Sequence, residues 1–195
     1  MRSYFFGAAL LFVCGAHGDQ SSSKCSEVEV QQDFSVSDYM GTWYTQAASN
    51  DINDLSDCTQ MTLDYDHDSD VVNMVEEFIA NGVPHTVKGI AVMADRHKDE
   101  GKLNATFDNA VLEQMPIPYW IVETDYDSYS VVYTCVSFLG LFKYSSIMLL
   151  SRDQEFDSEQ EPKLIDRVNY LMARNAINLP PLTRIDQTQC DLLYV

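Results

Sequence analysis

Residues 71–94 of the chain read VVNMVEEFIANGVPHTVKGIAVMA, and this stretch carries the strongest local signal for the fold. Asn81 and Gly82 stand at its centre. An Asn-Gly pair favours a two-residue turn, because such a turn needs positive φ angles at both positions, and β-forming residues flank the pair. We therefore predict a β-hairpin with strands at 71–80 and 83–94.

Similar short runs of alternating apolar and polar residues lie on both sides of this hairpin. Turn residues separate them, so with the hairpin they predict eight strands, at 41–48, 58–65, 71–80, 83–94, 102–108, 119–124, 128–137 and 144–151. Consecutive strands joined by tight turns favour an all-β, antiparallel up-and-down barrel. Closure of the barrel would also remove exposed sheet edges.

One helix is predicted after the last of these strands. Ser158 and Glu161 form a capping-box pattern, and Pro162 lies in the first turn. One face of the helix carries a stripe of apolar residues, Leu164, Val168, Leu171 and Met172. We expect this helix to end before Asn178 and Pro180 and to cover one side of the barrel.

The charge balance disfavours two classes of partner, and the N-terminal segment indicates a secreted protein. The 12 basic and 30 acidic residues give a formal net charge of −18, which disfavours nucleic acid and anionic membranes as partners. Residues 1–18 resemble an export signal, with Arg2 ahead of an apolar run at 5–13. No later segment approaches the roughly 20 apolar residues that span a bilayer. We expect residues 19–195 to form one domain after cleavage.

The cysteines support an oxidising compartment. Beyond the predicted signal they are Cys25, Cys58, Cys135 and Cys190, which suggests two disulfides with three possible connectivities. A metal site is disfavoured, because no CxxC or HxxxH spacing occurs. The Asn-Ala-Thr sequon at Asn104 predicts a surface glycan.

Three segments, in this order, resemble the lipocalin family. Residues 39–44 (YMGTWY) contain its Gly-x-Trp pattern, residues 124–135 (TDYDSYSVVYTC) its second motif, and residues 149–152 (LLSR) its terminal arginine motif. Residues 118–121 (PYWI) are similar to the apolipoprotein D group, and the chain also resembles the bilin- and carotenoid-binding lipocalins of invertebrates, insecticyanin and crustacyanin. The resemblance implies an eight-stranded antiparallel lipocalin barrel with a C-terminal α-helix packed on the wall.

The resemblance also implies which cysteines pair and what closes the barrel. By similarity the disulfides are Cys25–Cys135 and Cys58–Cys190. Trp43 and Arg152 should meet at the closed end in a cation–π contact, which we interpret as structural.

Period-two alternation then predicts the inner face of three strands. Arg152 points inward in the family pattern, so Met148 and Tyr144 should do so too. Cys135 must face outward to reach the N-terminal segment, which leaves Thr134 and Val132 inside. A glycan on Asn104 would also face outward and would place Phe107 inside.

The predicted lining is apolar and aromatic with a few hydroxyl groups, and we assign no acidic residue to it. Such a lining favours an uncharged or amphiphilic apolar ligand. The candidate ligand-binding residues are Leu63, Val75, Phe107, Tyr119, Trp120, Val132, Thr134, Tyr144 and Met148. Only one of the adjacent Tyr119 and Trp120 can face inward in a regular strand.

Two loops expected at the open end of the barrel are unusually apolar. One contains Met115 and Ile117, and the other contains Phe138, Leu139, Leu141 and Phe142. Exposed apolar clusters mark membrane, partner or ligand-entry surfaces. If exposed, these loops would favour a lipid surface or self-association; folded over the mouth, they would bury themselves.

We therefore expect a secreted carrier that reversibly buries a lipid, fatty acid, retinoid or sterol, without a required cofactor or metal. One alternative is a pigment lipocalin with a bound bilin or carotenoid. Another is a membrane- or partner-binding protein whose barrel is filled by side chains. Catalysis is disfavoured, because His67, His85 and His97 occur singly, without a paired nucleophile.

Overall fold

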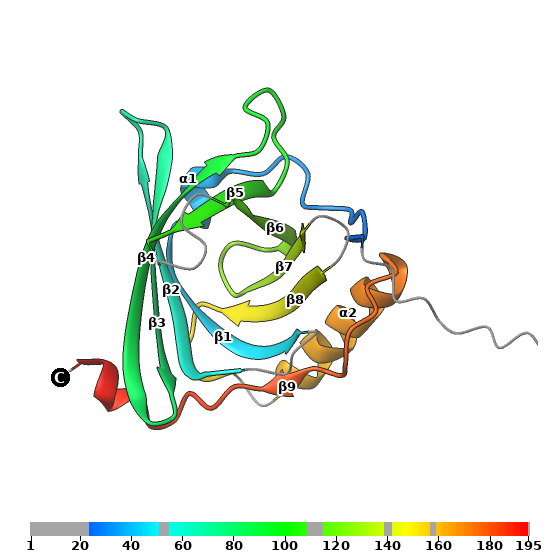
Figure 1. Ribbon diagram of the computed structural model, residues 1–195. Helices are drawn as coiled ribbons and strands as arrows, with labels where there is room; N and C mark the ends of the chain where they lie inside the picture. Colours follow the sequence, from blue (N-terminus) through cyan, green and yellow to red (C-terminus); the bar gives the residue numbers. More distant parts are fainter. Residues whose placement is uncertain (1–23, 51–54, 109–114, 139–141, 157–158, 195) are drawn as a thin grey trace, which may run out of the picture.

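Eight antiparallel strands close into a barrel, as predicted (Figure 1). The computed structural model describes residues 24–50, 55–108, 115–138, 142–156 and 159–194. The strands are β1 (Gly41–Asn50), β2 (Asp57–Asp66), β3 (Val71–Ala80), β4 (Val83–Met93), β5 (Lys102–Phe107), β6 (Ile117–Thr124), β7 (Tyr129–Phe138) and β8 (Phe142–Ser151). Each pairs with the next in sequence, and β1 pairs with both β2 and β8, which closes the sheet.

The predicted hairpin is confirmed as β3 and β4. Ala80 pairs with Val83, and the two residues between them, Asn81 and Gly82, have φ angles of 53° and 75°. Positive φ at both positions is what the Asn-Gly pair favours. The predicted signal at 1–18 lies outside the described residues, and no described helix is long and apolar enough to cross a bilayer.

Helix α2 (Glu161–Arg174) packs on the outer wall of the barrel (Figure 1). Val168, Leu171 and Met172 are buried against the outward faces of β7 and β8, as the apolar stripe predicts. The predicted N-cap at Ser158 is wrong: the cap is Gln160, and Ser158 itself lies outside the described residues. The helix starts later because Pro162 occupies its first turn, where a fixed φ and a missing N–H are tolerated.

The closed end is built around Trp43, behind the short helix α1 (Val36–Tyr39). The Arg152 guanidinium lies 3.6 Å from the Trp43 ring centroid, and it donates to the carbonyls of Tyr126 (2.9 Å) and Thr42 (3.1 Å). Gly41 has φ of +98°, and a Cβ there would lie 3.1 Å from Arg152 Nη1. The Gly-x-Trp and arginine motifs therefore form one plug, which confirms the expected contact.

Both disulfides pair as the resemblance implies, Cys25 with Cys135 and Cys58 with Cys190. The second one anchors a C-terminal segment, residues 183–190, which we call the strap. The strap contains β9 (Thr183–Arg184) and leads into the 3-10 helix η1 (Cys190–Tyr194).

The strap bridges a gap in the barrel wall. Strand β1 pairs with β2 only up to Tyr44, and on its other edge its register with β8 shifts between Thr45 and Ala47. Beyond that point β9 occupies the edge of β1. The Gln187 side-chain amide donates to the carbonyls of Thr45 (2.8 Å) and Thr59 (3.0 Å), one on each side of the gap. The wall is thus completed by residues from the far end of the chain.

Candidate ligand-binding site

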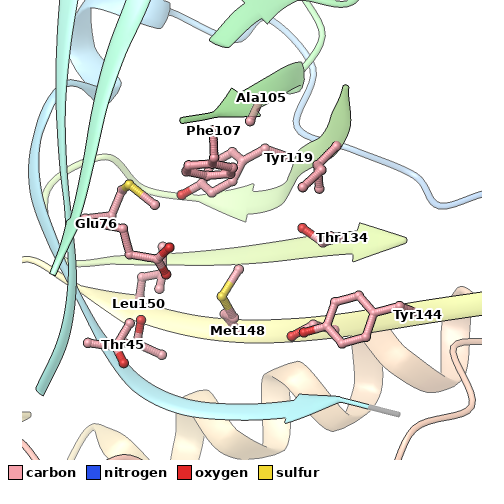
Figure 2. A pocket seen from close by; sticks show the side chains of 13 residues that line it. Thr45, Glu76, Ala105, Phe107, Tyr119, Thr134, Tyr144, Met148 and Leu150 are labelled. Atoms are coloured by element: carbon pink, nitrogen blue, oxygen red, sulfur yellow. The ribbon is translucent and has the colours of Figure 1, made fainter. Parts of the chain in front are cut away.

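The interior of the barrel contains a cavity of about 190 Å³ (Figure 2). A second space of about 240 Å³ adjoins it toward the open end and shares Thr45, Thr59, Glu76, Tyr144, Ser146 and Met148 with it. The inner cavity is lined by Thr45, Thr59, Met61, Glu76, Ala105, Phe107, Ile117, Tyr119, Thr134, Tyr144, Ser146, Met148 and Leu150. The described interior is therefore hollow, which argues against the filled-barrel alternative.

Strand alternation positions most of this lining. On β8, Tyr144 and Met148 face the cavity, as predicted from Arg152, and Ser146 and Leu150 on the same alternating face do so too. On β5, Phe107 faces Gly89 of β4, and a Cβ on Gly89 would come within 2.8 Å of the Phe107 ring. The missing side chain at Gly89 lets that ring lie close to the wall instead of filling the centre of the barrel.

The structure brings together five of the nine predicted ligand-binding residues: Phe107, Tyr119, Thr134, Tyr144 and Met148 all line the cavity. Val132 and Leu63 lie deeper, in the buried core with Trp43 at the closed end. Their roles as ligand contacts stay predictions.

Val75 and Trp120 do not line the cavity. Val75 lies between Met74, in the inner core, and Glu76, in the cavity wall, so alternation places it on the outer face. Trp120 packs in the outer cluster beneath α2, with Lys102 Nζ 5.3 Å from its ring centroid. Tyr119 takes the inward position of that adjacent pair.

The expectation that no acid faces inward is also wrong, because Glu76 lines both spaces. It pairs across the sheet with Met61, which lines the cavity as well. Burial raises the pKa of the Glu76 carboxyl from 4.5 to about 7. Sequence reasoning missed it because residues 71–80 carry apolar side chains on both faces, so the pattern does not reveal which face is inside.

Two buried tyrosines lie near the closed end: Tyr119 lines the cavity, and Tyr39 belongs to the buried core around Trp43. Burial holds the pKa of the Tyr119 hydroxyl well above the usual 10. Tyr39 shares a 2.9 Å hydrogen bond with Ser130, and burial raises its pKa to about 12. Both phenols are therefore protonated near neutral pH.

The apolar loops at the open end are described only in part. Met115 and Ile117 are half-buried, and Ile117 lines the cavity. Leu139 and Leu141 lie outside the described residues, as do the side chains of Phe138 and Phe142, whose backbones form the last pair of β7 and β8.

On β5, Asn104 lies on the outer face, opposite to its neighbour Ala105. Within the described ranges, no three His, Cys, Asp or Glu side chains are grouped to hold a metal ion.

The raised pKa of Glu76 predicts a loss of stability as the pH rises from about 4.5 to about 7. Its pKa of about 7 in the folded protein exceeds the usual 4.5, so the favourable contribution is present in full below pH 4.5 and is lost as the pH rises through about 7. The loss amounts to about 3 kcal/mol of unfolding free energy. We expect Glu76→Gln to remove this part of the pH dependence.

Urea unfolding of wild type and Glu76→Gln at about pH 5 and about pH 8.5 measures the difference. Glu77→Gln is the matched control, because Glu77 accepts a 2.8 Å hydrogen bond from Gln60 and does not line the cavity. Equal pH dependence in wild type and Glu76→Gln would contradict the assignment.

The sequence profile of the Lipocalin / cytosolic fatty-acid binding protein family matches residues 40–172. Apolipoprotein D from Rattus norvegicus is 28% identical over 167 residues, covering 86% of this chain and 84% of that protein.

Two solved structures share the fold. Insecticyanin from the tobacco hornworm Manduca sexta superposes with a TM-score of 0.69 at 21% identity, covering 85% of this chain and 87% of that chain. Lobster apocrustacyanin A1 superposes with a TM-score of 0.68 at 17% identity, covering 86% of this chain and 91% of that chain.

Proposed function

Because the chain belongs to the lipocalin / cytosolic fatty-acid binding protein family, we propose that it is a secreted carrier that binds a small hydrophobic molecule reversibly inside its barrel. The ligand class is a lipid, fatty acid, retinoid or sterol. The observation that carries the proposal is the hollow interior, whose wall consists mainly of apolar and hydroxyl-bearing side chains. Secretion is supported by the predicted export signal at residues 1–18 and by two disulfides, which persist in oxidising compartments.

Binding in this mechanism is burial without chemistry. A ligand that removes about 400 Å² of apolar surface from water gains about 10 kcal/mol. Several kcal/mol of this are lost with the ligand's freedom of motion, so dissociation constants on the order of micromolar are expected. The hydroxyls of Thr134 and Ser146 add polar contacts that orient the ligand.

A pigment carrier and a surface-binding role extend the same proposal. A bound bilin or carotenoid would give the protein isolated from its source a visible absorption band, which colourless ligands lack.

The mouth loops around Met115 and Phe138 would add contact with a lipid surface or a second copy of the chain. Vesicle flotation and sedimentation of the purified protein distinguish these two surface roles.

Filling the cavity will abolish binding without unfolding the barrel. Ser146 is a small residue that faces both spaces, and Ser146→Trp would place an indole where the ligand is proposed to lie. We expect the affinity for retinol, measured by retinol fluorescence, to fall by about tenfold or more.

Lys143→Trp is the matched control, since position 143 lies on the opposite face of β8 from Tyr144. Its affinity should stay within about twofold of wild type. Wild-type retinol binding that survives Ser146→Trp unchanged, with the barrel intact by circular dichroism, would refute the cavity as the binding site.

A further inference from the structure

The Glu76 carboxyl group is an unusual part of an otherwise apolar wall. Figure 2 shows its side chain reaching from the wall into the cavity. Glu76 lies where the two spaces meet, since it lines both of them. Among the residues that the structure describes, none donates a hydrogen bond to this carboxyl group or forms an ion pair with it. Its hydrogen-bonding capacity is therefore directed at whatever occupies the cavity.

The rest of the lining supplies no positive charge. None of the described cavity-lining residues is a lysine, an arginine or a histidine. An ionised carboxylate in a dry cavity is costly unless a donor or a cation pairs with it. A ligand with its own carboxylate would bring a second negative charge beside the first, with no described base to neutralise either. A cationic or hydrogen-bond-donating ligand would instead satisfy Glu76.

Tyr119 supplies a second polar atom from another wall of the same cavity. Its hydroxyl is buried next to that of Tyr39, and the phenolic oxygen still has a lone pair that can accept a further hydrogen bond. A phenol can accept a hydrogen bond from an ammonium group, and a carboxylate can accept several. Glu76 and Tyr119 thus offer acceptors close to apolar side chains such as Phe107, Met148 and Leu150.

We propose that the cavity selects apolar molecules that end in a protonated amine, with the ammonium group paired to Glu76 and the hydrocarbon part against Phe107, Met148 and Leu150. The inference rests on the proposed carrier function, because it concerns which ligand enters the same cavity. Within that function it ranks a long-chain amine above the matching alcohol, and the alcohol above the matching carboxylate. An alcohol donates one hydrogen bond without a charge, which gives it the middle position.

The test compares three ligands that differ only in their head group. Dodecylamine, dodecanol and dodecanoate are titrated by calorimetry at about pH 8 into wild type, Glu76→Gln and Glu77→Gln. In wild type the amine should bind about tenfold or more tighter than the carboxylate. In Glu76→Gln this ratio should fall to about threefold or less, while dodecanol changes little.

Glu77→Gln removes the same charge from outside the cavity and should keep the wild-type ratio. It therefore separates pairing with Glu76 from the general attraction of an acidic protein for cations. Equal affinities for the three ligands in wild type, or an equal loss of preference in both variants, would overturn the inference and leave the carrier function standing. Absence of binding by all three ligands and by retinol would instead refute the carrier function itself.

Discussion

Replacing Cys58 and Cys190 together by alanine will lower the free energy of unfolding by about 4–5 kcal/mol. The bond joins residues 132 apart in the sequence, so its loss frees a large part of the unfolded chain. The folded state loses contacts as well, because Cys58, Cys190 and Ile79 form a small buried cluster. Equilibrium urea unfolding without reductant, followed by far-ultraviolet circular dichroism, measures the loss.

The other disulfide provides the comparison for this experiment. Cys25–Cys135 spans 110 residues, and the dependence on loop length is logarithmic, so its double alanine variant should lose a similar amount. A loss below about 1 kcal/mol in the Cys58/Cys190 variant would mean that the hydrogen bonds of Gln187 hold the strap without the covalent link.

Trp43→Ala will cost about 3–5 kcal/mol of unfolding free energy. The side chain is fully buried at the closed end, so its removal leaves a large hole among Tyr39, Met61 and Leu63. The variant also loses the cation–π contact with Arg152 and the 2.9 Å hydrogen bond from the indole N–H to the Tyr39 carbonyl. The same urea experiment measures the loss by circular dichroism, which does not depend on tryptophan emission.

Trp43→Phe separates these contributions. It retains most of the apolar volume and a ring beneath Arg152 but lacks the indole N–H, so we expect a loss of about 1–3 kcal/mol. Equal stability of the alanine and phenylalanine variants would contradict this reasoning, because it would mean that Trp43 does not stabilise the fold by filling the closed end.

The inward face of a strand could be predicted from the sequence wherever the direction of one of its side chains was known. Arg152 fixed the inner face of β8, the outward Cys135 fixed β7, and the outward Asn104 fixed β5. Because side chains alternate strictly, one such residue determines a whole strand. This is why Phe107, Thr134 and Met148 were placed correctly.

No such residue was available on β3 or β6. On β3, apolar side chains occur on both alternating faces, so the sequence does not show which face is inside. A shift by one residue therefore placed Val75, and not Glu76, in the predicted lining. On β6, two aromatic residues are adjacent, and a register shift between Ile121 and Glu123 interrupts the alternation. The acidic group in the cavity could therefore be found only once the pairing of β3 with β2 and β4 was known.

The strap was likewise not predictable from local pattern. Strand β9 has two residues, too few for any periodicity, and it forms because β1 leaves an unpaired edge beyond Tyr44, where its pairing with β2 ends. Its partners lie more than a hundred residues away in the sequence, as for Gln187 and Thr45. The chain places a polar amide there because two carbonyl groups at the gap need a donor.

Ile185 belongs both to the strap and to the lining of the outer space, so the last part of the chain also encloses the cavity region. A chain ending at Leu182 would keep every barrel strand from β1 to β8 and the helix α2, but it would lack Cys190 and with it the bond to Cys58. It would also have a lateral opening between β1 and β2, through which water could enter and an apolar molecule could leave. Retention of the proposed ligand would therefore depend on the covalently anchored C-terminal segment as much as on the mouth of the barrel.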